Sequence, residues 1–402
     1  MEVHGSCDEK FQSVRQEFER NFRERDEVGA SVCVTVRGET VVDLWGGVAR
    51  PDTQTPWTAE TVSIIFSSTK GATALCAHVL ASRGQLDLDA PVATYWPEFA
   101  QAGKQNIPVK MLLNHQAGLP AVRQQLPQGA YADWELMVNA LAKEEPFWEP
   151  GTRNGYHALT MGWLVGEVVR RVSGKSLGTF FRDEIAKPLG LDFWIGLPED
   201  KEGRVAPMIA APPDPDSLFF KEIAKPGSLQ SLVLLNSGGY MGAKPEYDTR
   251  AAHAAEIGAA GGITNARGLA GMYAPLACGG KSNGVELVSP NTLARMARIS
   301  SATGRDAVLV MPTRFSLGFM KSMDNRREPL GVRDSVLISE EAFGHVGAGG
   351  SFGFADPRAE MSFGYTMNRM GPGASLNDRG QSLVDATYRS LGYQSEASGA
   401  WR

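Results

Sequence analysis

The sequence contains few cysteines and no long apolar run, and each scarcity excludes a class of protein. Its four cysteines, at positions 7, 33, 76 and 278, lie far apart with no metal-ligand spacing between them. We therefore expect reduced structural thiols, with neither a disulfide framework nor a metal site. No apolar segment reaches the length that a bilayer requires, and the first ten residues, MEVHGSCDEK, lack the apolar core of a signal peptide. The sequence predicts a cytoplasmic protein with no membrane partner and no cofactor.

An excess of positive charge is also missing. The chain has 40 lysines and arginines against 45 aspartates and glutamates, and its basic residues are scattered along the sequence. We therefore expect no basic surface for nucleic acid. With 402 residues, of which 43% are hydrophobic and 21% charged, the chain is long enough for two lobes that share one cleft. A small molecule is the expected partner.

Apolar patterns predict strands and helices near both ends of the chain. Phe11, Val14, Phe18 and Phe22 have the spacing of one helix face. Two strand-like runs around Gly38 predict a β-hairpin. The expected elements are a helix at 8–25, hairpin strands at 30–36 and 40–45, a helix at 265–276, strands at 316–319, 351–354 and 361–367, and a helix at 376–391.

This distribution predicts the domain organisation. Strands at both ends suggest one antiparallel sheet that the two termini close, flanked by the N- and C-terminal helices. Between them the pattern changes to helical pieces broken by loops that contain proline and glycine. We therefore expect an α+β fold in which residues 1–84 and 255–402 form an α/β domain. Residues 85–254 form an inserted, mainly helical domain with long loops, and the active site lies in the cleft between the two.

The stretch 198–256 is rich in proline, glycine and aspartate, and its least regular part is 211–216. This composition predicts long loops or a lid. The same stretch carries the apolar residues Leu229, Leu232, Val233, Leu234 and Leu235. These side chains either line a binding cleft or anchor the loop to the core.

The most informative motif is the tetrad Ser67-Ser68-Thr69-Lys70. Ser67 is the only serine that has a lysine three residues further on. At the start of a helix, this spacing brings the lysine amine back to the serine hydroxyl, and the helix N-terminus supplies N–H groups for a developing oxyanion. The tetrad therefore predicts an acyl-accepting serine. The alternative is a helix-capping serine followed by a solvated lysine.

The residues that follow the tetrad favour the catalytic interpretation. Residues 71–81 are small and apolar all round, which is typical of a buried helix. A lysine in the first turn of such a helix must find a partner or lose its proton. Either outcome suits a catalytic base at Lys70.

A serine and lysine pair needs a second acid/base group that protonates the leaving group. Tyr156 is the candidate, because the turn-rich segment 149–155 delivers it just before an apolar helix that ends near Gly174. The alternative is a tyrosine that serves packing or capping alone.

Near the other end of the chain, the glycine-dense segment 344–350 precedes a strand. Glycines such as Gly347 let a substrate lie close to the backbone, unless the segment is a tight turn needed only for shape. We expect the N–H groups of Ala348 and Ser67 to face one oxyanion. His345 either orients the tyrosine or the substrate in the cleft, or is an ordinary strand-end histidine.

A second serine motif is predicted to be inert. Gly349, Ser351 and Gly353 match the Gly-x-Ser-x-Gly pattern, which requires a strand, a sharp elbow and then a helix. Another strand follows here, so Ser351 is expected to be a sheet residue.

The tetrad Ser67–Lys70, the triplet Tyr156-His157-Ala158 and the triplet His345-Val346-Gly347, in this order, resemble the motifs of the serine β-lactamase-like superfamily. Within it the chain looks most like the family VIII carboxylesterases, and the similarity extends through 112–119 and 347–357. The resemblance implies a β-lactamase/DD-peptidase-like fold. It also implies Ser67 as nucleophile, Lys70 and Tyr156 as the proton-handling pair, and an acyl-enzyme that water hydrolyses.

Two departures narrow the expected substrate. Class C β-lactamases and DD-peptidases have an asparagine where this chain has Ala158, and Lys-Thr-Gly where this chain has His345-Val346-Gly347. The chain lacks that amide and that cation, and a neutral ester needs neither. The resemblance therefore implies a serine carboxylesterase for short-chain esters. The alternatives are β-lactam or D-amino-peptide hydrolysis, acyl transfer on the same acyl-enzyme, and a catalytically silent binding protein.

Overall fold

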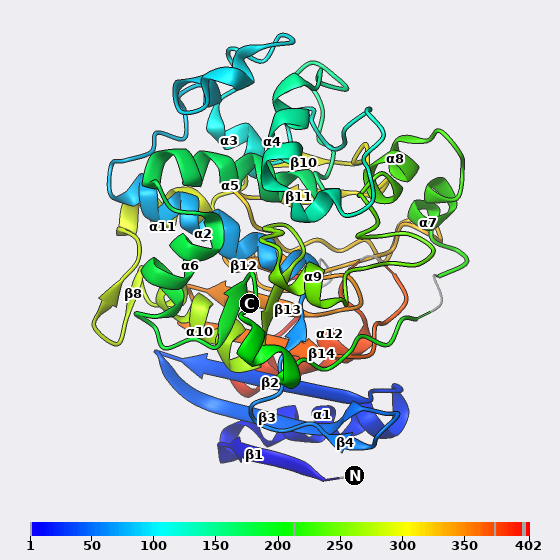
Figure 1. Cartoon of the computed structure of the whole chain (residues 1–402). Coiled ribbons are helices and arrows are strands. Elements are labelled where there is room, and N and C mark those ends of the chain that lie inside the picture. Colours follow the sequence, from blue (N-terminus) through cyan, green and yellow to red (C-terminus); the bar gives the residue numbers. More distant parts are fainter. Residues whose placement is uncertain (1, 212–213, 374, 396–398) are drawn as a thin grey trace.

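The computed structural model describes residues 2–211, 214–373, 375–395 and 399–402. Its main sheet has the strand order β1-β3-β2-β14-β13-β12, and every neighbouring pair is antiparallel (Figure 1). Both ends of the chain thus contribute to one sheet. The strands are β1 (Val3–Cys7), β2 (Gly29–Val36), β3 (Glu39–Arg50), β12 (Phe343–Val346), β13 (Phe352–Asp356) and β14 (Met361–Met367), with β4 (Thr55–Pro56) attached to β3.

Helices cover both faces of this sheet, which is why its central strands are buried along nearly their whole length. The terminal helices α1 (Gln12–Glu24) and α12 (Asp378–Ser390) pack together on one face, and α10 (Ala266–Ala277) packs on the other. Gly364 of β14 allows the close approach of α10, because a Cβ atom there would lie 2.3 Å from the Ala266 carbonyl oxygen. The predicted α+β architecture is confirmed.

The helical part of the molecule surrounds α2 (Thr69–Ser82), which follows a 3₁₀ turn at Phe66–Ser68. Every residue from 69 to 80 is buried, as the apolar circumference of this segment predicts. The chain enters α2 from β5 (Ser63–Ile64), which belongs to a small sheet of order β5-β7-β6. The remaining elements of this part are α3 (Val109–Leu113), α4 (Trp134–Lys143), α5 (Thr160–Ser173), α6 (Leu177–Phe181), α11 (Pro290–Ala297), β6 (Phe193–Ile195) and β7 (Gly262–Thr264).

Short elements complete the chain. They are a π-helical turn at Arg182–Ala186, 3₁₀ turns at Glu9–Phe11, Val92–Thr94, Pro97–Ala100, Ala130–Ala132 and Glu199–Arg204, and strands β8 (Lys281–Ser282), β9 (Val285–Glu286), β10 (Ser301–Thr303) and β11 (Thr313–Phe315). Within the described ranges, no helix is long and apolar enough to cross a bilayer.

The stretch 198–256 contains more regular structure than expected. Three short helices interrupt its loops: α7 (Leu218–Ile223), α8 (Leu229–Leu235) and α9 (Arg250–Ala254). Pro212 and Pro213 lie outside the described residues. Val233 of α8 is buried in the hydrophobic cluster that also contains Tyr156, whereas Leu235 is 48% exposed. Most of the apolar run therefore anchors α8 to the core.

The predicted strand at 316–319 is wrong. This segment is a tight turn in which the Ser316 N–H donates to the Phe319 carbonyl at 2.8 Å. Gly318 adopts a left-handed φ of +94° and lies against α2, and His78 of α2 hydrogen-bonds to the Leu317 carbonyl at 2.8 Å. A side chain of α2 thus supplies a hydrogen bond to the backbone of this segment, in place of the backbone bonds that a neighbouring strand would have made.

We predict that Gly318→Ala destabilises the fold by about 2 kcal/mol or more. The new methyl group would be in a left-handed backbone conformation and would lie 2.3 Å from the Ala74 Cβ atom. Gly84→Ala is the matched control, because Gly84 also has a positive φ, +69°, but open space around it. Thermal unfolding gives the loss of stability of each variant. Equal losses for Gly318→Ala and Gly84→Ala would contradict the packing argument.

Candidate active site

Ser67 lies where the chain turns from β5 into α2. The turn places Phe66 at a φ of +44°, an uncommon conformation for a residue other than glycine, and the Phe66 ring packs edge-on against Tyr247 at 5.0 Å. Of residues 61–80, all of which are described, only Ser67 is not fully buried. The local fold therefore leaves Ser67 partly exposed in the middle of an otherwise buried segment.

The Lys70 amine is enclosed next to that hydroxyl. Its Nζ atom donates to the Ala158 carbonyl at 2.7 Å and to the Ala259 carbonyl at 2.9 Å, and it lies within hydrogen-bond distance of Ser67 Oγ, at 3.1 Å. The side chain is completely buried, and burial holds the pKa of Lys70 well below its usual value. The sequence prediction that Lys70 lies in the first turn of a buried helix and reaches back to Ser67 is correct.

Tyr156 approaches the same two groups from the segment that precedes α5. Its ring centre lies 4.7 Å from Lys70 Nζ, and the residue is buried, with an exposed fraction of 6%. Burial raises the pKa of Tyr156 above its ordinary value, while a hydrogen bond with Ser67 acts in the opposite direction. The structure thus brings Ser67, Lys70 and Tyr156 together.

Two distant segments hold the backbone around Tyr156. The Tyr156 N–H donates to Asp306 Oδ1 at 2.9 Å. The Gly155 N–H donates to the His115 carbonyl at 3.1 Å, and the His157 N–H donates to His115 Nδ1 at 3.2 Å. Neither His115 nor Asp306 is among the site residues that the sequence predicts. His115 lies in the segment that carried the family resemblance, whereas no local pattern marks Asp306.

Gly347 and Ala348 form a turn that packs against the residues before Ser67. The Gly350 N–H closes this turn on the Gly347 carbonyl at 2.9 Å. A Cβ atom on Gly347 would lie 2.1 Å from the Ile65 carbonyl oxygen, so only glycine permits this approach. Among the described residues, the N–H groups of Ser67 and Ala348 have no hydrogen-bond acceptor, so both are available to a bound oxygen.

His345 lies beside Tyr156, and the two ring centres are 6.1 Å apart. Burial and the nearby Lys70 amine lower the pKa of His345 to about 3. The ring is therefore neutral at physiological pH. Its Nδ1 atom hydrogen-bonds to the Val346 carbonyl at 2.8 Å, and its Nε2 atom has no partner in the part of the chain that the structure describes. The structure thus places His345 next to Tyr156, and its role in orienting the tyrosine or a substrate stays a prediction.

Comparison with known families matches residues 17–387 to the family described as Beta-lactamase. The chain belongs to the β-lactamase family. Its relatives include Esterase/beta-lactamase LipL from Mycobacterium tuberculosis, which is 35% identical over 382 residues that cover 92% of this chain and 83% of LipL.

Solved structures of β-lactamase-family proteins agree with this assignment. A crystal structure described as a family VIII carboxylesterase is 38% identical, with a TM-score of 0.86 and coverage of 97% of this chain and 100% of that one. EstA from Arthrobacter nitroguajacolicus is 32% identical, with a TM-score of 0.84 and coverage of 98% and 99%. The predicted resemblance and the β-lactamase-like fold are confirmed, and the chain is a hydrolase of this family.

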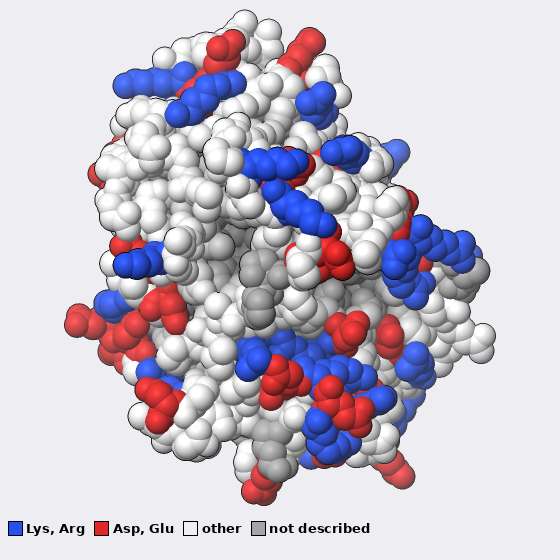
Figure 2. All heavy atoms as spheres, turned by 90° about the vertical axis from the view of Figure 1, so that its right-hand side faces the viewer, with Lys and Arg blue, Asp and Glu red and all other residues white. Residues whose placement is uncertain are grey.

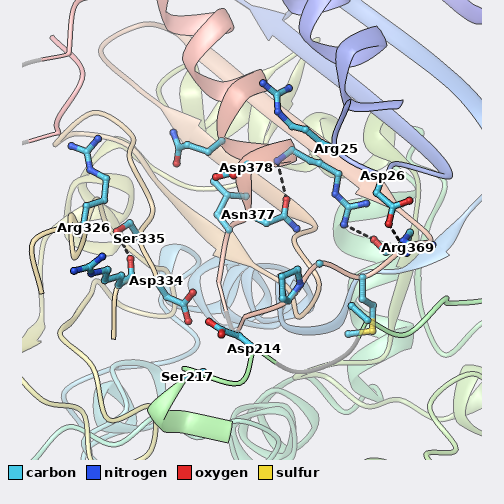
Figure 3. Close-up of a pocket in the computed structure, with 18 of the residues that line it drawn as sticks. Arg25, Asp26, Asp214, Ser217, Arg326, Asp334, Ser335, Arg369, Asn377 and Asp378 are labelled. Atoms are coloured by element: carbon cyan, nitrogen blue, oxygen red, sulfur yellow. Dashed lines mark hydrogen bonds and ion pairs between the residues drawn. The ribbon is translucent and has the colours of Figure 1, made fainter. Parts of the chain in front are cut away.

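The β-lactamase-family chain also contains a cavity of about 800 Å³ that none of Ser67, Lys70 and Tyr156 lines (Figure 3). It adjoins the turn that carries Ala348, because Asn377, one of its lining residues, donates from Nδ2 to the Gly349 carbonyl at 2.8 Å. Four of the arginines that line it are paired with carboxylates: Arg25 with Glu17, Arg326 with Asp324, Arg369 with Asp26 and Arg379 with Glu27. Basic and acidic side chains are likewise interspersed over the face that carries α7 and α8 (Figure 2). The cavity is thus charge-compensated and separate from Ser67.

Ser351, the second serine motif, has a structural position. It is buried directly before β13, and its hydroxyl donates to the Ile65 carbonyl at 2.8 Å. The expectation that no helix follows is confirmed, so the elbow geometry of that motif is absent at this serine.

We predict that Ser351→Ala remains open to labelling by a fluorophosphonate, while its free energy of unfolding falls by about 1 kcal/mol through the lost hydrogen bond. Mass spectrometry of the labelled wild-type protein provides the check. Attachment of the label to the peptide that contains Ser351 would contradict this assignment.

Proposed function

We propose that the protein is a serine carboxylesterase that hydrolyses short-chain carboxylic esters through an acyl-enzyme on Ser67. The observation that carries this proposal is the 3.1 Å contact between Ser67 Oγ and a fully buried Lys70 amine, with the Tyr156 ring 4.7 Å from that amine. A serine hydroxyl is a weak nucleophile unless an adjacent base takes its proton. Lys70 and Tyr156 supply that base.

The acceptors around Lys70 suit a neutral amine. A neutral amine has two N–H bonds and one lone pair, and the carbonyls of Ala158 and Ala259 account for the two N–H bonds. The lone pair then faces the Ser67 hydroxyl. Because no carboxylate is among these three partners, burial alone is sufficient to favour the uncharged form.

In the proposed acylation step, Ser67, Lys70 and Tyr156 exchange one proton among themselves and with the leaving group. The pair of Lys70 and Tyr156 takes the Ser67 proton as Oγ bonds to the ester carbonyl carbon. The N–H groups of Ser67 and Ala348 stabilise the negative charge on the carbonyl oxygen. When the C–O bond breaks, Tyr156 passes the proton to the leaving alkoxide. Water then attacks the acyl-enzyme and returns the site to its starting state through the same groups.

The groups beside this triad favour an uncharged substrate. His345 and its neighbour His115 both have a lowered pKa because of burial, so neither ring presents a cation to a substrate carboxylate. The names Esterase/beta-lactamase LipL, family VIII carboxylesterase and Esterase EstB among similar proteins support ester hydrolysis. The name LipL also supports β-lactam hydrolysis as a second, weaker activity of the same acyl-enzyme.

We predict that Ser67→Ala abolishes hydrolysis of p-nitrophenyl butyrate, and that Tyr156→Phe lowers kcat by a factor of about 10². A panel of p-nitrophenyl esters of increasing chain length, measured beside nitrocefin, gives the reaction type and the depth of the acyl pocket. Ser351→Ala is the matched serine control and should keep measurable activity, because its hydroxyl is only a structural contact to Ile65 and Ser68. Near-normal turnover by Ser67→Ala would refute the proposed mechanism.

We predict that kcat/KM rises with pH through the ionisation of Lys70, and that this rise occurs well below the ordinary lysine pKa of about 10.4. The sign follows from the active form, which is the deprotonated amine. Lys70→Arg should lose activity by a factor of about 10² or more at every pH, because a guanidinium does not deprotonate in proteins. The pH profile is measured with Ser67→Ala as the blank for spontaneous ester hydrolysis, and a fully active Lys70→Arg variant would exclude Lys70 as a base.

A further inference from the structure

Asp306 is a buried carboxylate that the catalytic proposal does not use. Its exposed fraction is 0%, and it takes part in no ion pair among the residues that the structure describes. A carboxylate without a cationic partner is costly to bury unless hydrogen bonds to its oxygens compensate it. The partners of these oxygens therefore indicate what the side chain does.

Three backbone N–H groups converge on one oxygen of Asp306. Oδ1 accepts from Val308 at 2.8 Å, from Leu309 at 2.9 Å and from Tyr156 at 2.9 Å. The first two donors belong to the loop of Asp306 itself. The third lies 150 positions earlier in the sequence and is the N–H of the tyrosine that faces Ser67 and Lys70.

The loop that follows Asp306 makes a second hydrogen bond to the segment that carries Tyr156. The Ala307 N–H donates to the Asn154 carbonyl at 2.9 Å, two residues before Tyr156. Val310 has a φ of +56°, a strained conformation for a β-branched side chain. Such strain persists where surrounding contacts determine the backbone, and it is common near functional sites.

Helix α8 also makes hydrogen bonds to this loop. The Gln230 side-chain amide donates to the carbonyls of Ala307 at 2.9 Å and of Val308 at 3.1 Å. Gln230 thereby connects α8 to the loop that contacts Tyr156.

We propose that Asp306 is a positioning residue for Tyr156. Its carboxylate fixes the backbone that directs the tyrosine hydroxyl toward Ser67, and Gln230 holds the loop that carries this carboxylate. The inference rests on the proposed esterase mechanism, in which Tyr156 transfers a proton. Neither Ser67 nor Lys70 is among the hydrogen-bond partners of the Asp306 side chain, so in this proposal it acts only through the tyrosine.

A double-mutant cycle in the full-length chain tests this role. Asp306→Ala and Tyr156→Phe are made singly and together, and kcat and KM are measured with p-nitrophenyl butyrate. We expect Asp306→Ala to lower kcat between about 10-fold and 10²-fold with KM nearly unchanged, because a misplaced acid/base group slows chemistry more than binding. In the Tyr156→Phe background the same substitution should change kcat by less than about two-fold.

A conservative replacement of Asp306 separates the effect of its hydrogen-bond acceptor from the effect of its negative charge. Asp306→Asn keeps the Oδ1 acceptor for the three N–H groups, so it should recover kcat to within about 10-fold of the wild type. An Asp306→Ala variant with wild-type kcat, an equal loss in both backgrounds, or an Asp306→Asn variant as impaired as Asp306→Ala would each overturn the proposal.

Two further measurements keep the test decisive. If Asp306→Ala does not unfold cooperatively, it is not a folded variant, and Gln230→Ala replaces it in the cycle. We expect Gln230→Ala to lower kcat about two-fold or more in the wild-type background and to leave kcat unchanged in the Tyr156→Phe background. An unchanged kcat in the wild-type background overturns the proposal. A Tyr156→Phe variant that keeps the wild-type kcat instead contradicts the esterase mechanism, and the two failures are therefore distinguishable.

Discussion

The enclosure of one amine in the interior of the molecule is the constraint on which the arrangement of the site depends. Lys70 lies in the first turn of α2, where every neighbouring residue is buried, and its partners are two carbonyls and one hydroxyl. A charged ammonium there would lose its hydration without gaining a carboxylate. The low pKa that follows suits the role of base that we propose for the amine, and the same burial requires α2 to be apolar on all sides.

Serine hydroxyls join two segments that are distant in sequence, the start of α2 and the region from β12 to β13. The Ser68 hydroxyl reaches the carbonyls of His345 and Ser351 at 3.0 and 3.1 Å, and the Ser351 hydroxyl reaches the carbonyl of Ile65. These bonds fix the start of α2 against β12 and the turn that follows it. The N–H groups of Ser67 and Ala348, which the proposed mechanism assigns to one oxyanion, belong to these two segments, about 280 residues apart in sequence.

Local patterns in the sequence predicted those parts of the fold and site that local physics determines. The spacing of Ser67 and Lys70, the apolar circumference of α2 and the hairpin around Gly38 each have a short-range signature, and each matches the structure. The segment 316–319 has the apolar pattern of a strand, but contact with α2 converts it into a turn. Asp306 could not be found in this way, because its partner Tyr156 is distant in sequence.

The acceptors that surround the Lys70 amine belong to the main chain, at Ala158 and Ala259. A side-chain replacement at either position leaves a carbonyl oxygen in place, so point mutation cannot easily delete this half of the amine's environment. Side chains near Ser67 can therefore differ between related chains while these two acceptors stay in place. In the proposed mechanism, substitutions that change substrate preference would therefore leave the hydrogen-bond acceptors of the catalytic amine unchanged.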